Sequence, residues 1–260
     1  MKKFLTLIVT LIMMLAGAAL AESAPCGFLN VDSSQAADGY IVVRRPETEK
    51  RLTVTVGREP WSAEYPLDDE MVTLPLQFGN GNYLISLYGA SEDHPEPGSL
   101  LDSVQISVKM DNPLSCFLHP NLYVRYDSGS PWVLKAEELT AGLTDPKEQY
   151  EAISDYIVNN YAYSFIKSVT EQPDALPDIQ DCWDQKMGIS QDLAALGCAM
   201  LRCRGIPAML FTGSQKDGIT YSWVVAVVNQ EFILFDPTER VCASEKTDLL
   251  FSLYRDAMAY

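Results

Sequence analysis

Histidine is nearly absent from this chain of 260 residues, which contains only His94 and His119. Histidine is the usual general base near neutral pH and a common ligand of metal ions. Any acid–base mechanism or metal site that needs an imidazole must therefore use one of these two positions. Both precede a proline in turn or connecting segments, so we expect solvated loop residues, and we predict no metal site and no cofactor.

Basic residues are also scarce. Lysine and arginine number 19 and aspartate and glutamate 35, which gives a net charge of 19 − 35 = −16. Because clustered basic side chains hold phosphates, this charge argues against nucleic acid and anionic membrane surfaces as partners. Apolar residues make up 47% of the chain and charged residues 21%, which is the composition of a protein with a core and not of an acidic tail.

The sequence has one long apolar run, and it lies at the start of the chain. Lys2 and Lys3 precede a nearly continuous apolar stretch over residues 4–15, and residues 19–21 supply the small-x-small pattern that signal peptidase cleaves. The run is too short for a comfortable membrane-spanning helix. We therefore expect residues 1–21 to be a signal peptide cleaved after Ala21. The mature protein is predicted to be secreted or extracytoplasmic, without stable insertion in a membrane.

The paired Cys-x-x-Cys spacing of zinc sites is missing as well. Six cysteines allow 15 pairings, and the sequence leaves the pairing open. Their positions are best explained by buried small apolar side chains, with room for one or two disulfides. Two of them look like loop residues and are better disulfide candidates than Cys198, which falls inside a predicted helix. The six are Cys26, Cys116, Cys182, Cys198, Cys203 and Cys242, of which Cys182 and Cys242 are the two loop candidates.

The first part of the chain has the pattern of short strands. Residues 52–56 and 104–108 alternate apolar and polar side chains, as half-buried strands do, and residues 79–82 form a tight-turn signal. Several short strands at this spacing predict a small immunoglobulin-like β-sandwich over residues 22–112, followed by a connector over residues 113–144. The predicted strands cover residues 40–44, 51–56, 71–77, 83–88 and 104–108.

Helical patterns begin at Asp145. An acidic N-cap, proline at the first helical position and Glu148 in a capping box open one helix, whose apolar stripe includes Tyr150. A second helix opens near Ser190 and has an apolar face with small residues on its other sides, so we expect it to be buried on most sides. Gly205 ends it. Strands over residues 208–211, 222–228 and 231–235 follow, the last two as a hairpin that ends at residues 236–238.

These motifs resemble the transglutaminase-like (papain-like) domain. Residues 188–196, 200–207, 221–223 and 235–238 follow the order of that family: a glycine, a buried helix, a Gly-Ile-Pro stop, a strand with tryptophan and an Asp-Pro-Thr turn. Residues 74–83 and 117–126 also resemble its exported Gram-positive bacterial branch, where the domain follows a β-sandwich. The resemblance implies an α+β protein in which a papain-like α/β domain over residues 145–260 follows the sandwich.

The sequence departs from the family where the chemistry takes place. The resemblance puts the family's nucleophilic cysteine on Ser190 and its histidine on Tyr221, and only the aspartate, Asp236, is retained. A thiol has a pKa of ~8.5 and ionises readily at a helix N-terminus, whereas a serine hydroxyl needs a base. Tyrosine, with a pKa of ~10, is a hydrogen-bond donor at neutral pH and a poor base. We expect Asp236 to accept its proton in a hydrogen bond without making the pair catalytic.

Other residues in this part of the chain offer weaker routes to catalysis. Cys182 is a displaced nucleophile candidate, Lys186 or Lys216 is a base candidate for Ser190, and His119 is a base candidate from the connector. A structural role is the better interpretation of each of them. Ser190 itself is explained by an ordinary N-cap role.

Two residues beside the triad positions are candidates for lining a cleft. Trp223 is one of them, although a core position explains it better, and Gln191 is the other. We predict an exported, catalytically inactive transglutaminase-like protein that acts as a binding or scaffolding module for peptide or cell-wall material. The alternative is a hydrolase or acyl transferase that uses Ser190 or a relocated nucleophile. In a third hypothesis the domain only positions the sandwich, which binds the partner.

Overall fold

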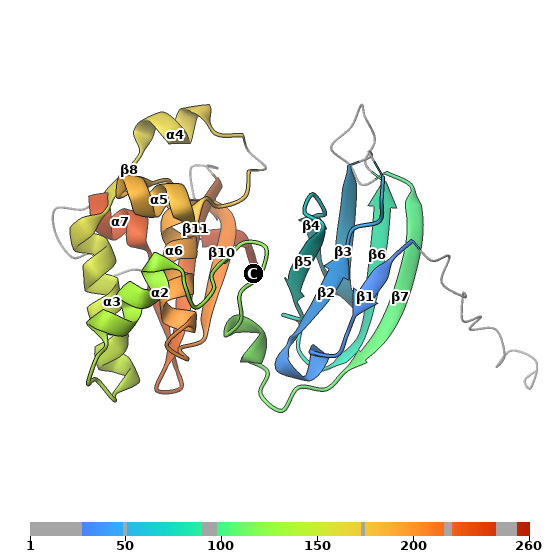
Figure 1. Cartoon of the computed structure of the whole chain (residues 1–260), viewed down its shortest axis with the longest axis horizontal. Coiled ribbons are helices and arrows are strands. Elements are labelled where there is room, and N and C mark those ends of the chain that lie inside the picture. The colour runs from blue at the N-terminus through green and yellow to red at the C-terminus, as the bar shows by residue number, and fades with distance from the viewer. Residues whose placement is uncertain (1–27, 49–50, 90–97, 173–174, 216–219, 243–253) are drawn as a thin grey trace, which may run out of the picture.

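The computed structural model describes residues 28–48, 51–89, 98–172, 175–215, 220–242 and 254–260. The predicted signal peptide, Cys26, His94 and Lys216 lie outside the described residues. The chain forms a β-rich region and a mixed α/β region that lie side by side (Figure 1). Within the described ranges, no helix has both the length and the apolar character needed to cross a membrane.

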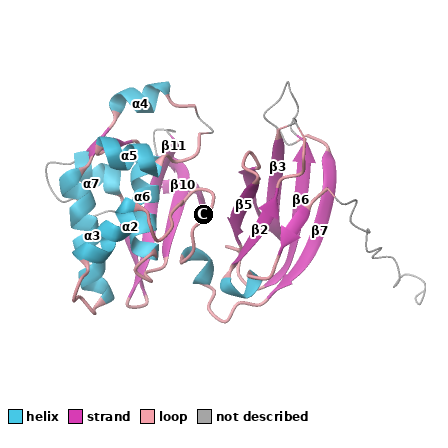
Figure 2. Cartoon of the chain, in the orientation of Figure 1, coloured by secondary structure: helices cyan, strands magenta, loops and turns pink. Residues whose placement is uncertain are grey.

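The β-rich region consists of two antiparallel sheets. One has the strand order β1-β2-β5 and the other β4-β3-β6-β7 (Figure 2). Every strand predicted from the alternating pattern is present here. Two more were missed, since β1 is too short to show a period and β4 follows directly on Pro60. The strands are β1 (Asn30–Asp32), β2 (Tyr40–Arg44), β3 (Leu52–Arg58), β4 (Trp61–Pro66), β5 (Met71–Pro75), β6 (Gly81–Gly89) and β7 (Leu100–Val108), and the helix η1 (Ala36–Asp38) lies between the first two.

Alternating side chains of these strands form one core. Val54 and Val56 of β3 and Ile85 and Leu87 of β6 are fully buried, while the residues between them face outward. Each buried aliphatic side chain contributes about 1.5–3 kcal/mol. The period of two in the sequence therefore decides which face of each strand enters the core.

The α/β region has a four-stranded antiparallel sheet of order β12-β11-β10-β13, with helices on the face turned away from the β-rich region (Figure 1). The structure adds several short elements and a last strand to the predicted ones. The helices are η2 (Ser115–Phe117), α2 (Pro131–Leu139), α3 (Pro146–Asn160), α4 (Phe165–Thr170), α5 (Ile179–Gln185), α6 (Ser190–Arg202) and α7 (Pro237–Cys242). The strands are β8 (Ala162–Tyr163), β9 (Met187–Gly188), β10 (Ala208–Gln215), β11 (Thr220–Val228), β12 (Glu231–Phe235) and β13 (Tyr254–Ala259).

Helix α3 begins as the sequence predicts. The side chain of Asp145 accepts a hydrogen bond from the backbone N–H of Lys147 at 3.0 Å, and Pro146 is the first helical residue. Its stripe residue Tyr150 is buried and contacts Phe235 of β12 edge-to-face. Helix α2, within the predicted connector, joins the same core through Trp132, Val133 and Ala136.

Helix α6 is the centre of the α/β region. All of its residues except Gln191 are buried, which confirms the prediction of a helix enclosed on most sides. A Cβ atom at Gly197 would lie 3.3 Å from the ring of Phe235, so a larger side chain would push α6 away from β12. Beyond the helix, Gly205 has a φ of 75°, the left-handed conformation expected for a glycine stop.

A buried arginine ties α6 to the connector and to the residue after β13. The Arg202 guanidinium donates hydrogen bonds to the backbone oxygens of Ala208, His119 and Tyr260, each at 2.8 Å. The ring of Tyr260 lies 5.8 Å from that of Tyr65 in the core of the β-rich region. Burial lowers the pKa of Arg202, and three carbonyl dipoles replace the water it has lost.

The cysteines differ from expectation. Cys182 lies inside α5 and Cys242 is the last residue of α7, so the prediction that both occupy loops was wrong. Asp178 caps α5 by accepting a hydrogen bond from the N–H of Asp181, and this turns a polar stretch into a helix. The described cysteines are all free thiols, so none of the disulfides considered from the sequence joins them. They are Cys116, Cys182, Cys198, Cys203 and Cys242.

Candidate functional site

Ser190 is the first residue of α6 and faces strand β11. Its Oγ accepts a hydrogen bond from the backbone N–H of Ser222 at 3.3 Å, and the residue is only 8% exposed. The N-cap is Ile189, which has extended backbone angles, so the prediction that Ser190 is the N-cap was wrong. The N–H of Ile189 donates to the Asp192 carboxylate at 3.0 Å, which gives this helix start one half of a capping box without a serine cap. An N-cap role therefore does not explain why serine occupies position 190.

The carboxylate of Asp192 fixes the segment in front of this helix. It is fully buried and accepts hydrogen bonds from the N–H of Asp178 at 2.9 Å and from Lys167 Nζ at 2.8 Å. Burial lowers the pKa of Lys167, but the hydrogen bond to Asp192 and the nearby carboxylates outweigh it, and the pKa is raised. A Cβ atom at Gly188 would lie 2.9 Å from both Asp192 Cβ and Cys182 Sγ, so only glycine fits there.

Tyr221 and Asp236 meet directly. The Tyr221 hydroxyl donates a hydrogen bond to Asp236 Oδ1 at 2.9 Å, which is the bond expected from the sequence. The same oxygen accepts the backbone N–H of Glu239 at 2.9 Å, and Asp236 is fully buried. Burial and the neighbouring Asp236 carboxylate raise the pKa of Glu239. Tyr221 and Asp236 are thus brought together, while Ser190 is bonded to the backbone of Ser222, the residue that follows Tyr221. The Tyr221 ring packs against the cluster that contains Trp223.

The sequence profile of the transglutaminase-like superfamily matches residues 135–237, from within α2 to the start of α7. This part of the chain is a transglutaminase-like domain. The matched range contains the α6 helix, the β11–β12 hairpin and the three residues compared above with the family's triad, Ser190, Tyr221 and Asp236. No curated protein sequence gives a significant match to the chain.

Solved structures similar to the chain share little sequence with it. A proposed cysteine protease from Cytophaga hutchinsonii is 18% identical over 75% of this chain and 68% of its own, with a TM-score of 0.42. A proposed protease from Parabacteroides distasonis is 18% identical over 75% and 39%, with a TM-score of 0.38. Red sea bream transglutaminase is 14% identical over 79% and 48%, with a TM-score of 0.31. The chain spans less than half the length of the last two.

The two cleft candidates of the transglutaminase-like domain have different surroundings. Trp223 is 2% exposed, and its ring stacks on Phe211 at 5.8 Å with an angle of 10° between the ring planes. It lies in a small cluster with Cys116 and Met209, on the sheet face opposite α6. Gln191 is half-buried beside Ser190. Trp223 therefore occupies the core position that explained it better from the sequence.

The other residues considered as catalytic groups are engaged elsewhere. Cys182 is fully buried, and burial raises the pKa of its thiol to about 12. Lys186 Nζ lies 3.5 Å above the ring of Trp183 and 3.0 Å from the Tyr161 hydroxyl, and burial lowers its pKa. The ring of His119 lies 4.8 Å from that of Tyr40 in the β-rich region. Each of them has contacts that explain a structural role.

Two cavities lie away from the triad positions. One, of about 950 Å³, lies on the outer face of sheet β4-β3-β6-β7, and the other, of about 300 Å³, lies between β5 and residues 120–126. Neither is lined by Ser190, Tyr221 or Asp236. Within the described ranges, no three His, Cys, Asp or Glu side chains gather as metal ligands. Sequence reasoning missed the larger cavity, although Gly57 inside an alternating strand is a signal for a missing side chain on the outer face of the sheet.

Proposed function

We propose that the transglutaminase-like domain is catalytically inactive and that the protein is an exported binding or scaffolding module. The observation that carries this proposal is the side-chain set at the triad positions. Tyr221 stands where the family has its histidine, and its hydroxyl is held by Asp236 at 2.9 Å. A neutral tyrosine hydroxyl that donates a hydrogen bond to a carboxylate is a poor general base and does not take the proton of the Ser190 hydroxyl.

The chemistry of Ser190 supports the same proposal. Its Oγ accepts the N–H of Ser222, and a backbone amide cannot remove a proton from a hydroxyl. General-base catalysis is typically worth about 10²–10⁴-fold in rate, and within the described part of the chain no side-chain base is hydrogen-bonded to Ser190 Oγ to supply it. Gly188, helix α6 and the β11–β12 hairpin then keep the fold of the family's site, while the side chains that would catalyse acyl transfer are replaced.

Chemical labelling tests the proposal against its alternative, a hydrolase or acyl transferase that uses Ser190. That alternative is favoured by one observation, the burial of Ser190 at a helix start where it caps nothing. We expect the purified protein to show no fluorophosphonate labelling and no peptidase, amidase or transamidase turnover. Labelling or turnover that Ser190→Ala abolishes would establish the enzyme instead.

A gain-of-reactivity variant tests whether the framework is that of the family. The double variant Ser190→Cys with Tyr221→His restores the thiol, the imidazole and the aspartate of the family pattern. We expect its new cysteine to react with iodoacetamide near neutral pH much faster than the cysteine of Ser190→Cys alone, because an imidazole lowers the thiol pKa. Equal rates in the two variants would contradict the assignment of Tyr221 to the histidine position.

We further propose that the β-rich region is an immunoglobulin-like sandwich. The Tyr83 hydroxyl, near the start of β6, donates toward the oxygens of Leu76 and Gly79 at 2.9 and 2.8 Å and accepts the N–H of Phe78 at 2.9 Å. A tyrosine bonded back to the preceding turn at this strand is a hallmark of the immunoglobulin fold, and the two strand orders fit it as well. The proposed limits are residues 22–112 for the sandwich, 113–144 for the connector and 145–260 for the second domain.

Export and partners belong to the same proposal. Cleavage after Ala21 would be tested by determining the N-terminal residue of the protein recovered outside the cytoplasm of a bacterial host. A mature chain that begins at Glu22 supports export, and an intact residue 1 contradicts it. The acidic net charge supports a peptide or cell-wall partner over nucleic acid.

A further inference from the structure

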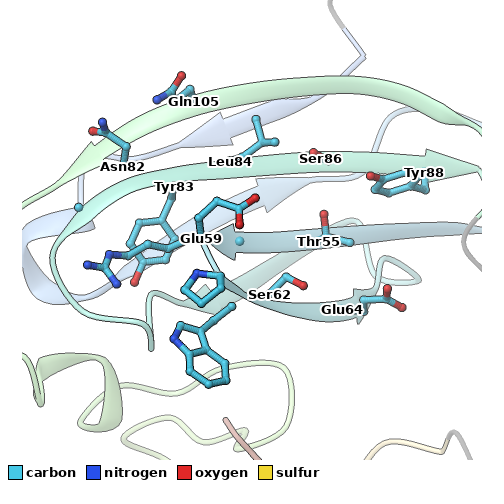
Figure 3. Close-up of a pocket in the computed structure, with 15 residues that line it drawn as sticks. Thr55, Glu59, Ser62, Glu64, Asn82, Tyr83, Leu84, Ser86, Tyr88 and Gln105 are labelled. Atoms are coloured by element: carbon cyan, nitrogen blue, oxygen red, sulfur yellow. The ribbon is translucent and has the colours of Figure 1, made fainter.

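The two cavities differ in what the backbone offers to an occupant. The larger cavity (Figure 3) lies over β3, which is bonded to β4 on one side and to β6 on the other, so its floor offers side chains only. The smaller cavity, of about 300 Å³, lies along β5 at the edge of sheet β1-β2-β5. One of its walls is formed by residues of the range 69–73, and the other by residues 120–122 with Arg125 and Tyr126. We name this smaller cavity the edge cavity.

The hydrogen bonds on either side of β5 determine which of its residues bond to β2. The N–H of Leu76 donates to the oxygen of Gly39, and the oxygen of Glu70 accepts the N–H of Arg45, both at 2.8 Å. Opposite residues of an antiparallel pair alternate between exchanging two backbone hydrogen bonds and exchanging none. In the register of the two strands, the even-numbered residues of β5 are therefore the ones bonded to β2.

The odd-numbered residues of β5 turn their backbone groups away from β2, toward the connector. The oxygen of Thr73 accepts the N–H of Leu122 at 3.2 Å, which agrees with this direction. Among the described residues, the N–H of Thr73 and the N–H and C=O of Met71 have no hydrogen-bond partner. These three groups are an unpaired stretch of sheet edge beside the edge cavity.

Asn121, on the opposite wall, also lacks a hydrogen-bond acceptor. Its Oδ1 accepts the N–H groups of Tyr123 and Val124 at 3.0 and 2.9 Å, which fixes the orientation of the amide. The residue is 5% exposed, and its buried Nδ2 has no partner within the described ranges. A buried polar group without a partner costs about 1–3 kcal/mol. Both walls therefore carry hydrogen-bonding groups that an occupant would satisfy.

We propose that the edge cavity binds an extended segment of a partner polypeptide, which adds a strand to β5. An extended backbone presents N–H and C=O groups at the spacing of the unpaired edge, and strand addition is a recurring mode of peptide recognition. A residue of the segment opposite Met71 exchanges two hydrogen bonds with it, and the residue two positions away accepts the N–H of Thr73. This proposal rests on the binding role proposed above and names the ligand class.

The side chain of Arg125 bridges the two walls in the free protein. Its guanidinium donates to the oxygen of Leu122 at 3.1 Å and pairs with Asp69 at 2.8 Å. The Arg125 and Asp69 side chains are 50% and 51% exposed, and an exposed ion pair contributes about 0–1 kcal/mol. Edge strands are commonly protected by charged side chains in this way, and here the protecting pair opens at little cost.

The walls favour a single segment over a second copy of the chain. The connector lies along β5 on the open side, and the N–H of Leu122 already reaches Thr73. A strand that belongs to a folded sheet has other strands or loops beside it, which would meet residues 120–122, whereas an isolated segment fits between the walls. The charged groups of the lining are one carboxylate and one guanidinium that pair with each other, so the segment needs no particular charge.

The experiment follows the backbone amides of the full mature protein by two-dimensional NMR while the peptide acetyl-Thr-Val-Thr-Val-Thr-amide is added. We expect the signals of Met71 and Thr73 to shift saturably, because their N–H groups gain acceptors. The same peptide methylated on its three central backbone nitrogens loses the donors that strand pairing requires. It should bind at least about tenfold more weakly.

Proline variants test the backbone groups directly. Met71→Pro and Thr73→Pro each remove one unpaired N–H and leave the bonds to β2 in place, as Pro75 does at another odd-numbered position of the same strand. Both are expected to fold and to bind the peptide at least about fivefold more weakly. Met71→Leu changes the same exposed side chain but keeps the N–H, so its affinity should stay within about twofold of the wild type.

The outcomes separate this proposal from the one on the triad. Ser190→Ala should leave peptide affinity unchanged, whichever way the activity screen turns out. The proposal is overturned if the peptide causes no saturable shift, if the methylated peptide binds as tightly, or if the folded proline variants bind like the wild type. Shifts of Met71 and Thr73 that follow the protein concentration and not the peptide would also overturn it, and would assign the edge to a second copy.

Discussion

Replacing Asp192 by alanine should cost far more stability than replacing an exposed aspartate. The wild-type carboxylate is fully buried and accepts the N–H groups of Ile189 and Asp178 and the Nζ of Lys167. Alanine leaves two partly buried N–H groups without this partner, at about 1–3 kcal/mol each. It also breaks the ion pair with Lys167, whose side chain is 18% exposed, so this contribution is below the roughly 3–5 kcal/mol typical of a fully buried pair. Since these two descriptions overlap, we expect a total of about 3–5 kcal/mol.

Urea denaturation followed by far-ultraviolet circular dichroism measures this loss. For a domain of this size the same change lowers the Tm by roughly 6–20 °C. Asp155→Ala, on the exposed face of α3, is the matched control and should change stability by less than about 0.5 kcal/mol. A loss for Asp192→Ala below about 1 kcal/mol, or equal to that of the control, would refute the account of this site.

The partner lysine gives the prediction a pH dependence. The pKa of Lys167 is raised in the folded protein, so its pairing stabilises the fold at pH values below the unfolded pKa of ~10.4 and is lost as the pH rises through the folded value. Wild type should therefore lose stability in strongly alkaline solution, and Lys167→Met should lose less over the same interval. Parallel pH profiles of the two proteins would contradict the pairing.

Other predictions concern the core of the transglutaminase-like domain. Gly188→Ala places a methyl group 2.9 Å from Cys182 Sγ and should cost about 1–3 kcal/mol in urea denaturation, whereas a neutral effect would contradict this close approach. Burial raises the pKa of the Cys198 thiol to about 12, so this thiol should react with a disulfide reagent only under denaturing conditions. Cys242 is exposed and should react in the native state. Mass spectrometry of the labelled protein distinguishes the two cysteines. Arg202→Met removes a donor from the carbonyls of Ala208, His119 and Tyr260, of which Tyr260 keeps the N–H of Leu210, and should lower the Tm by several degrees in a thermal scan. An unchanged Tm would show that the others find new partners.

Local pattern was enough to predict the elements that position the candidate site. The apolar stripe of α6, its stop at Gly205 and the β11–β12 hairpin depend on neighbours in sequence, and the structure has each of them. The hydrogen bond from Tyr221 to Asp236 followed from aligning the motifs in order. Strand β13 was missed because β10, with which it pairs, lies far away in the sequence.

The errors at the site have one physical origin. Serine at a helix start is normally a cap, but here the carboxylate of Asp192 takes the N–H of Ile189, which leaves Ser190 to face β11. A tertiary contact thus overrode a local preference. The larger cavity, on the outer face of sheet β4-β3-β6-β7, was missed for a related reason, because its lining comes from four strands whose register is fixed only when the sheet forms.

The three backbone oxygens that accept hydrogen bonds from Arg202 have a consequence for how the chain folds. Two of its acceptors, on His119 and Tyr260, are 83 and 58 residues away along the chain. Contacts between such distant segments slow folding, since a large loop must close before they form. We therefore expect the Arg202 guanidinium to stay solvated during folding until Tyr260 has docked. We then expect the complete burial of α6 and its docking against the β-rich region to occur together, late in folding. A folding intermediate in which β13 has not yet paired should therefore be cleaved by proteases more readily than the native protein.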